Sequence, residues 1–259
     1  MARKSLKVNV NPAVMKWARE SAGLDTDTVK KRLNVSTGTI QEWEQGTKKP
    51  TLTTLETLAS YYKRPLAAFF LPEPPPEPSM PTDFRVLPRE KRHPLSKKTR
   101  LAIRRATRVQ SLATELEQTK GDIGETIANI ASASLSDDPE ITAESARSSI
   151  AITVEDQYSF KSLYEAFDKW RGALESLNIV VYQTPFPLEE ARGFSLLDHK
   201  LPIIVINISD AIAARIFTLF HEYAHLLLGA SGICIPNETY HDDADAQEVE
   251  RFCDHFAGS

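Results

Sequence analysis

Cysteine is scarce in this chain of 259 residues, where only Cys234 and Cys253 occur. Two cysteines are too few for the disulfide framework of a small secreted protein, and they fit a reducing compartment; one bridge between them is the alternative. No run approaches the roughly 18 apolar residues that a membrane helix needs. The start, MARKSLKVNVNP, lacks the apolar core of a signal peptide. We therefore expect a cytoplasmic protein without membrane contact.

Charge of opposite sign dominates the two halves of the chain. Residues 1–120 carry 23 Lys and Arg against 12 Asp and Glu, whereas residues 121–259 carry 8 against 23. A basic segment attracts a phosphate backbone, and an acidic segment is repelled by it. The front half is therefore the expected partner of DNA, and the rear half is expected to present solvated acidic faces.

Prolines cluster in the stretch LPEPPPEPSMP, which begins at Leu71. Proline lacks a backbone donor and favours extended chain, so residues 72–82 are predicted to form a linker. The predicted domains on either side of the linker are residues 1–71 and residues 83–259, the latter with a helical part at 96–177 and a second part at 178–259.

Hydrophobic periodicity predicts a mainly α fold with a small β-sheet, of the α+β class. The front domain is predicted to be a five-helix bundle, with helices at Pro12–Ala22, Asp27–Leu33, Thr37–Gln45 and Leu52–Tyr62 and a last turn from Pro65. Later helices are predicted at Ser96–Gln118, Asp122–Ser134, Ala143–Ile152 and Phe160–Leu177. Strands are predicted at residues 179–183, Gly193–Leu197 and Leu201–Ile208.

The segment Ser209–Gly229 is predicted to be one helix. It contains no proline, Ser209 or Asp210 can cap its start, and a glycine ends it. Its predicted core stripe consists of Ile212, Ile216, Phe220 and Leu227. The opposite face carries two histidines above the small residues Ala214 and Thr218.

Those histidines, His221 and His225, stand four residues apart in the motif HEYAH. On a helix this spacing brings both imidazoles to one face, about one turn apart, as tetrahedral zinc requires. Glu222 can reach a metal-held water and take its proton without being a ligand. The alternative is a buried helix whose histidines bond to backbone or carboxylate groups. The small residues below them favour a metal, with zinc expected and manganese the alternative.

A catalytic zinc takes three protein ligands, and the predicted helix Asp243–Ala257 is the expected source of the third. The core side of this helix is predicted to be Val249, Phe252, Cys253 and Phe256. Glu250 flanks that side and is the predicted third ligand, while Asp254, one turn later, is predicted to orient a ligating histidine. The alternative ligands are His255 and His241.

The strand predicted at Leu201–Ile208 directly precedes the histidine helix. We expect it to lie at an edge of the sheet, where an extended peptide can pair with its backbone. Such an edge would suit a peptidase.

These segments resemble the ImmA/IrrE family of metallopeptidases. The resemblance rests on PIIVIN, RIFTLFHEYAHLLLG and EVERFCDHFAG, and it covers roughly residues 160–258. It implies a zincin-like fold and cleavage of helix-turn-helix repressors. It also implies His221, His225 and Glu250 as metal ligands and Glu222 as the base. The last helix of the family continues beyond the point where this sequence stops, so we expect the catalytic part to be shortened at its C-terminus.

Residues 8–71 resemble the XRE-type helix-turn-helix family through the segment NVSTGTIQEWEQGTKKPTLTTLETLASYYKRPLAAFF. Ser36 is predicted to cap a helix whose inner face holds Ile40 and Trp43. The outer face of this helix carries Thr37, Gly38, Gln41, Glu42 and Gln45. It is the element expected in the major groove of DNA.

Thr37 and Gln41 are the predicted base-facing contacts, and Lys48 and Lys49 are placed for phosphates. Glu42 weakens this assignment, because in the groove its carboxylate can accept only from the amino group of cytosine. The alternative is a bundle kept for protein contacts. A basic run beyond the linker is predicted to be a solvated helix face or one paired with the acidic second half, and the alternative is an extended contact with DNA. The run consists of Lys97, Lys98, Arg100, Arg104, Arg105 and Arg108.

Two functions follow from these patterns. The first is a DNA-binding regulator with an active zinc endopeptidase that cleaves a helix-turn-helix repressor, either another protein or a second copy of itself, with a homodimer left open. The second is a DNA-binding transcription factor whose peptidase-like domain senses a metal or a ligand without proteolysis.

Overall fold

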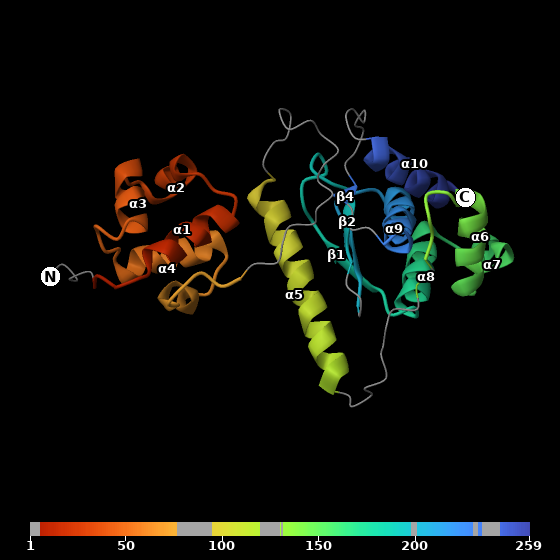
Figure 1. Cartoon of the computed structure of the whole chain (residues 1–259), viewed down its shortest axis with the longest axis horizontal. Coiled ribbons are helices and arrows are strands. Elements are labelled where there is room, and N and C mark those ends of the chain that lie inside the picture. Colours follow the sequence, from red (N-terminus) through yellow and green to blue (C-terminus); the bar gives the residue numbers. More distant parts are fainter. Residues whose placement is uncertain are drawn as a thin grey trace. The chain divides into compact units, whose positions relative to one another are not determined.

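The computed structural model describes residues 6–76, 95–119, 130, 132–197, 201–229, 233–234 and 244–259. Contacts divide the described chain into two compact units, one of residues 6–76 with 95–101 and one from residue 102 onward (Figure 1). The predicted fold class, mainly α with a small β-sheet, is confirmed. No helix that the structure describes is both long and apolar enough to cross a membrane.

The first unit is the predicted helical bundle. Its elements are α1 (Pro12–Ser21), α2 (Thr26–Leu33), α3 (Thr37–Glu44), α4 (Leu52–Tyr62) and the 3-10 helix η1 (Leu66–Phe70). Each α-helix begins where a side chain accepts a backbone N–H of the first turn, the caps being Asn11, Asp25, Ser36 and Thr51. These caps satisfy donors that a helix start leaves without partners.

The core of this unit takes residues from every helix. Ile40 and Trp43 turn inward from α3, as predicted, and pack with residues such as Leu55 of α4 and Phe69 of η1. Burying side chains of this size stabilises the bundle by roughly 1.5–3 kcal/mol for each aliphatic or aromatic residue. The packing fixes α3 against the bundle and leaves its other face to solvent.

The second unit contains the remaining helices and the sheet. Its elements are α5 (Lys97–Thr119, whose first turn belongs to the first unit), α6 (Pro139–Ser149), α7 (Val154–Ser159), α8 (Leu163–Glu175), β1 (Val180–Thr184), β2 (Gly193–Leu196), β3 (Ile203–Asn207), α9 (Ile212–Leu227), β4 (Ile233–Cys234) and α10 (Ala244–Gly258). The predicted helix Asp122–Ser134 lies largely outside the described residues, and its described end is not helical. Residues 77–82 of the predicted linker also lie outside them.

The strands form one sheet in the order β1-β3-β2-β4. β3 pairs in parallel with β1 and antiparallel with β2. The prediction of an edge strand at Leu201–Ile208 is therefore wrong. All five residues of β3 are buried, and a continuous run of β-branched residues is typical of a strand covered on both faces. A substrate peptide has no free backbone edge on this strand.

α9 lies across β2 and β3 and is flanked by α8 and α10 (Figure 1). Because neighbours surround α9, the predicted core stripe is incomplete. Leu227 is buried, but Ile212, Ile216 and Phe220 are only partly buried. The most deeply buried core side chains of α9 are instead Leu219, Tyr223 and Ala224.

The start of α9 also differs from the prediction. Its N-cap is Ala211, which offers no side-chain acceptor. Asp210 is occupied elsewhere, because its carboxylate accepts from Arg192 at 2.5 Å and from the Ala211 N–H at 2.8 Å. At the other end Gly229 adopts a left-handed conformation with φ of 67°, which agrees with the glycine expected there.

Candidate metal centre and DNA-binding face

The two histidines of α9 meet at one point. The Nε2 atoms of His221 and His225 are 3.2 Å apart, and each residue is about 1% exposed. Both rings leave the helix on the side that faces α10. Two donor nitrogens of the kind that bind zinc are thus held together inside the unit.

Glu250 of α10 closes the group. Its Oε2 atom lies 3.1 Å from Nε2 of His221, and its Oε1 atom lies 3.3 Å from Nε2 of His225. The ligand atoms of the three residues all lie within 4.8 Å of one another. α10 is held in this position by Phe252, Cys253 and Phe256, whose burial agrees with the predicted core side.

Glu222 lies on the same helix and is completely buried. Neither oxygen of its carboxylate has a hydrogen bond of normal geometry within the described residues. Burial raises the pKa of Glu222, while the charges of His225 and His221 and the hydroxyl of Ser195 act in the opposite direction. A buried carboxylate that lacks full solvation is suited to accept a proton.

Strand β2 makes room for this carboxylate at Gly193. A Cβ atom at that position would lie 2.5 Å from Cγ2 of Thr218, 2.9 Å from the carbonyl oxygen of Val205 and 3.5 Å from Cγ of Glu222. The first two distances are shorter than packed atoms tolerate, and the third is an ordinary packing distance. The glycine therefore permits α9 to approach β2 at Thr218, one turn before Glu222.

Asp254 supports the group from one turn beyond Glu250. Its Oδ1 atom lies 2.9 Å from Nδ1 of His221, so with Nδ1 protonated the histidine offers Nε2 to the centre. The structure thus places Asp254 where the sequence predicted it. His255, one alternative ligand, is exposed and outside the group. His241, the other, lies outside the described residues.

The charges of the centre favour a cation. Burial lowers the pKa of His221, but the hydrogen bonds to Asp254 and Glu250 and the charges of Glu222 and Glu250 outweigh it and raise the pKa. The pKa of Glu250 is lowered: burial opposes the shift, and contacts with both histidines outweigh burial. Three carboxylates around two imidazoles leave a deficit of positive charge. Two imidazole nitrogens and a carboxylate oxygen are also a donor set that zinc accepts, so these residues fit the metal.

The outer face of α3 is the second candidate site. Ser36 caps the helix and accepts from the Thr39 N–H at 3.1 Å, as predicted. Gln41 is exposed. Thr37 is half-buried, and its hydroxyl donates to Asp27 at 3.3 Å. Gln41 is therefore presented openly, whereas Thr37 is already engaged by α2.

The two lysines after α3 differ in their surroundings. Nζ of Lys48 lies 3.0 Å from Oε2 of Glu42, and both side chains are about half exposed. Lys49 is exposed and takes part in no described ion pair. The structure thus separates two lysines that the sequence placed in one role.

Comparison with models of protein families found two matching segments. Residues 15–69 match the model described as helix-turn-helix. Residues 174–258 match a peptidase-family model described as the IrrE N-terminal-like domain. The chain joins a helix-turn-helix domain to an IrrE N-terminal-like domain. Searches among curated proteins and among solved structures found no match.

These two domains define a DNA-binding regulator with a peptidase-like domain. The candidate metal group lies entirely within the IrrE N-terminal-like domain, and all of α3 lies within the helix-turn-helix domain. The peptidase family suggests dependence on a metal, in agreement with the predicted class of cofactor.

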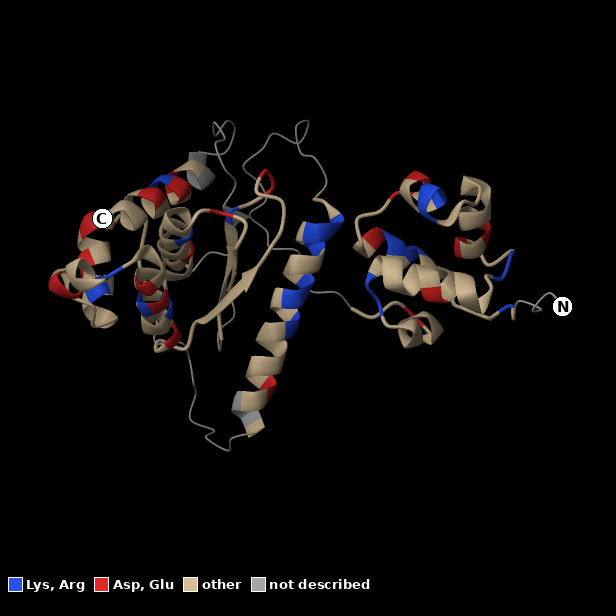
Figure 2. Ribbon diagram, turned by 180° about the vertical axis from the view of Figure 1, so that it is seen from behind, with Lys and Arg blue, Asp and Glu red and all other residues tan. Residues whose placement is uncertain are grey.

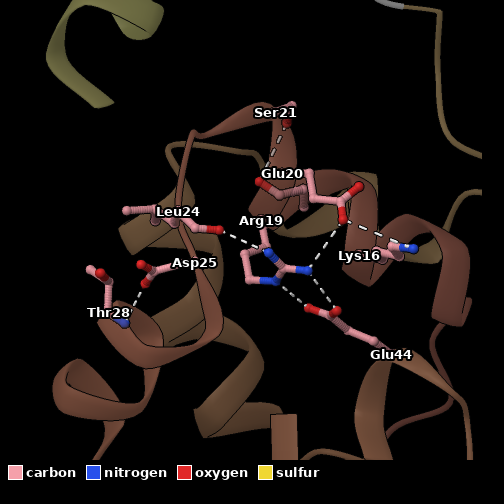
Figure 3. A network of polar contacts seen from close by, with 9 residues as sticks. Lys16, Arg19, Glu20, Ser21, Leu24, Asp25, Thr28 and Glu44 are labelled. Atoms are coloured by element: carbon pink, nitrogen blue, oxygen red, sulfur yellow. Dashed lines mark hydrogen bonds and ion pairs between the residues drawn. The ribbon is translucent and has the colours of Figure 1, made fainter. Parts of the chain in front are cut away.

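Within the helix-turn-helix domain a buried ion pair ties α1 to α3 (Figure 3). Arg19 donates from Nε to Oε1 of Glu44 at 2.7 Å and from Nη2 to Oε2 at 2.9 Å. A third bond runs from Nη1 to the carbonyl oxygen of Leu24 at 2.8 Å. The hydrogen bond to Glu44 is the largest influence on the pKa of Arg19 and raises it. The two hydrogen bonds to Glu44 hold the end of α3 against α1.

The basic run lies along the first half of α5 (Figure 2). Its members are not equally solvated. Nζ of Lys97 lies 3.8 Å from the ring centroid of Tyr61, and Nε of Arg100 donates to the carbonyl oxygen of Leu95 at 3.2 Å. Burial lowers the pKa of Arg104. The prediction of a solvated face therefore holds for the exposed Lys98, Arg105 and Arg108 and not for the whole run.

Sequence reasoning missed three features of these sites. Gly193 and Ser195 lie beneath Glu222 only because of how β2 is placed against α9, which no local pattern reveals. The pairing of Arg19 with Glu44 spans 25 residues and carries no short-range signal. α7, in contrast, had a visible signal, because Thr153 and Asp156 form a capping box.

Proposed function

We propose that this protein is a cytoplasmic transcriptional regulator whose IrrE N-terminal-like domain is an active zinc endopeptidase. The observation that carries the proposal is the convergence of His221, His225 and Glu250, whose ligand atoms all lie within 4.8 Å of one another, beside Glu222. Manganese is the alternative metal for two imidazoles and one carboxylate. Three protein ligands leave a fourth position for water, the usual form of a catalytic zinc site.

Each residue has a defined part in this proposal. His221, His225 and Glu250 hold the ion, and Asp254 keeps His221 in the tautomer that offers Nε2. The bound ion supplies Lewis-acid chemistry that lowers the pKa of water and polarises a peptide carbonyl. Glu222 takes the proton of the attacking water at its carboxylate and passes it to the leaving amine.

The burial of Glu222 supports its part as the base. Without solvating water around its carboxylate, the protonated and ionised forms are closer in free energy than at an exposed position. Such a group takes up a proton more readily than an exposed carboxylate does.

The proposed substrate is a helix-turn-helix repressor. The helix-turn-helix domain brings the chain to DNA on which such repressors also bind, and the short proline-rich stretch keeps the peptidase nearby. Exposed loops between domains are the usual sites of proteolysis, and an extended loop fits a peptidase best. Cleavage between the DNA-binding and dimerisation parts of the repressor would end its binding to paired half-sites. The chain itself is proposed to bind such half-sites as a homodimer.

The test is incubation of the zinc-loaded or manganese-loaded chain with helix-turn-helix repressors encoded near its own gene. We expect one repressor to be cut at a single region and to remain intact with Glu222→Gln, which removes the base and no ligand. Repressors that stay intact with both metals would contradict the proposal.

A second candidate function is metal sensing without proteolysis. It is favoured by the burial of the site, since Glu222 is 0% exposed and Glu250 is 6% exposed. In that case zinc would change the affinity for DNA, and no repressor would be cut. Measuring DNA affinity with and without zinc in the Glu222→Gln variant separates the two functions, because only a sensor responds without the base.

A further inference from the structure

The loop that follows α3 is fastened to Glu42. The N–H of Lys48 donates to the carbonyl oxygen of Glu42 at 3.2 Å, and the hydroxyl of Thr47 donates to the same oxygen at 3.1 Å. Nζ of Lys48 then reaches the Glu42 carboxylate at 3.0 Å. Lys48 is thus tied to Glu42 through both its backbone and its side chain.

This ion pair has little value for folding. The two side chains are 48% and 49% exposed, and exposed pairs contribute little because water and salt screen them. Its effect is on the charge and the position of the Glu42 carboxylate. A lone carboxylate on the outer face of α3 would be repelled by DNA phosphates. With Lys48 beside it, the charge is compensated and the carboxylate is held in one place.

The base edges of the major groove decide what a held carboxylate can bind. It needs a donor, which only cytosine and adenine present there. On adenine the amino group lies beside the acceptor N7, which repels a carboxylate, whereas cytosine presents its amino group alone. Guanine and thymine present acceptors at this edge. A fixed carboxylate therefore discriminates for cytosine.

We propose that Glu42 selects a cytosine in the DNA site and that Lys48 is the positioning residue for it. This inference rests on the proposed binding of DNA by the helix-turn-helix domain, and it names the determinant of its sequence preference. It also revises the assignment of Lys48 as a simple phosphate contact. Lys49, exposed and adjacent, keeps that role.

The experiment uses the full chain and a library of random DNA duplexes. Duplexes that stay bound to the chain at low salt are sequenced. Kd is then measured for a duplex selected in this way and for versions of it in which each cytosine is replaced in turn. For wild type we expect one cytosine whose replacement weakens binding by on the order of tenfold. Glu42→Ala should bind both versions alike, and Glu42→Gln should shift the preference toward adenine, because glutamine pairs with the adenine edge.

The matched controls are the two lysines. Lys49→Ala should weaken all duplexes alike and keep the cytosine preference, since it removes one phosphate contact. Lys48→Ala should reduce the cytosine preference itself. Circular dichroism of each variant checks that the helices are retained, as expected for exposed positions.

Three results would contradict the account in different ways. A Glu42→Ala variant that selects the same cytosine overturns the role of Glu42. A Lys48→Ala variant indistinguishable from Lys49→Ala overturns the positioning role of Lys48. A wild-type chain that retains no duplex contradicts DNA binding itself, and this outcome appears in the first step, before any variant is compared.

Discussion

Gly193 leaves space beside the candidate metal centre that a larger residue would fill. In Gly193→Ala the new methyl group would lie 2.5 Å from Thr218 and 2.9 Å from the backbone of Val205. Overpacking of this kind costs about 1–3 kcal/mol, and relief by movement of α9 would displace Glu222. We expect a lower melting temperature together with loss of repressor cleavage. Gly172→Ala is the control, because Gly172 is an exposed position of α8 and nothing lies within 4 Å of a Cβ built there. Equal melting temperatures for both variants would refute the account of Gly193.

Asp254 provides a second test with a single side chain. It accepts from Nδ1 of His221 at 2.9 Å, and loss of such a partner lowers metal affinity by about 10–100-fold. Titration of the Asp254→Ala chain with zinc should show this weakening. Glu248→Ala removes an exposed carboxylate from the same helix and should leave zinc affinity unchanged. An equal loss of zinc affinity in both variants would mean that the net charge of the helix, and not the bond between Asp254 and His221, determines the affinity.

The convergence of the three proposed ligands could be anticipated from the sequence because it follows local rules. Spacing within α9 places His221 and His225 on one face, and the apolar side of α10 indicates which way Glu250 points. The surroundings of Glu222 were not predictable, since Gly193 and Ser195 belong to a strand whose position against α9 is set by the whole sheet.

At the scale of the helices, one buried ion pair joins α1 to α3. Arg19 and Glu44 each have about 10% of their side chain exposed, and they form two hydrogen bonds. Removing one partner from a buried pair costs about 3–5 kcal/mol, because the other charge stays buried and unpaired. We expect Glu44→Ala to lower the free energy of unfolding of the helix-turn-helix domain, measured by chemical denaturation, by this amount. Glu20→Ala, at an exposed position on α1, should change stability by at most about 1 kcal/mol. A loss in Glu44→Ala as small as that in Glu20→Ala would show that the pair is not needed.

Elements with strong periodicity and clear caps were predicted nearly to the residue, α4 being one case. Two failures have physical causes. The expected edge strand is internal, because a continuous apolar run leaves open which strands pair with it. The N-cap of α9 was misassigned because Asp210 is held by Arg192, a contact across 18 residues that local capping rules cannot include.

For the chain as a whole, the separation of charge predicts how DNA binding responds to salt. Residues 1–71 contain 12 Lys and Arg against 6 Asp and Glu. Log affinity falls as log salt rises, and each phosphate contact makes this fall steeper by about 0.9. We expect Kd for DNA to rise steeply with salt, and Lys49→Ala to lower the slope by about 0.9. Kd measured at several salt concentrations checks both, and an affinity independent of salt would exclude binding through phosphates.

The most direct test of the account as a whole is the metal content of the purified chain after equilibration with zinc and dialysis. Wild type should retain one zinc ion per chain. Glu222→Gln should retain the same amount, because this residue is assigned to water and not to the metal. Glu250→Gln should lose the ion, since only two ligands remain. Full retention of zinc by Glu250→Gln, or a wild-type chain that retains none, would contradict the metal centre described for His221, His225 and Glu250.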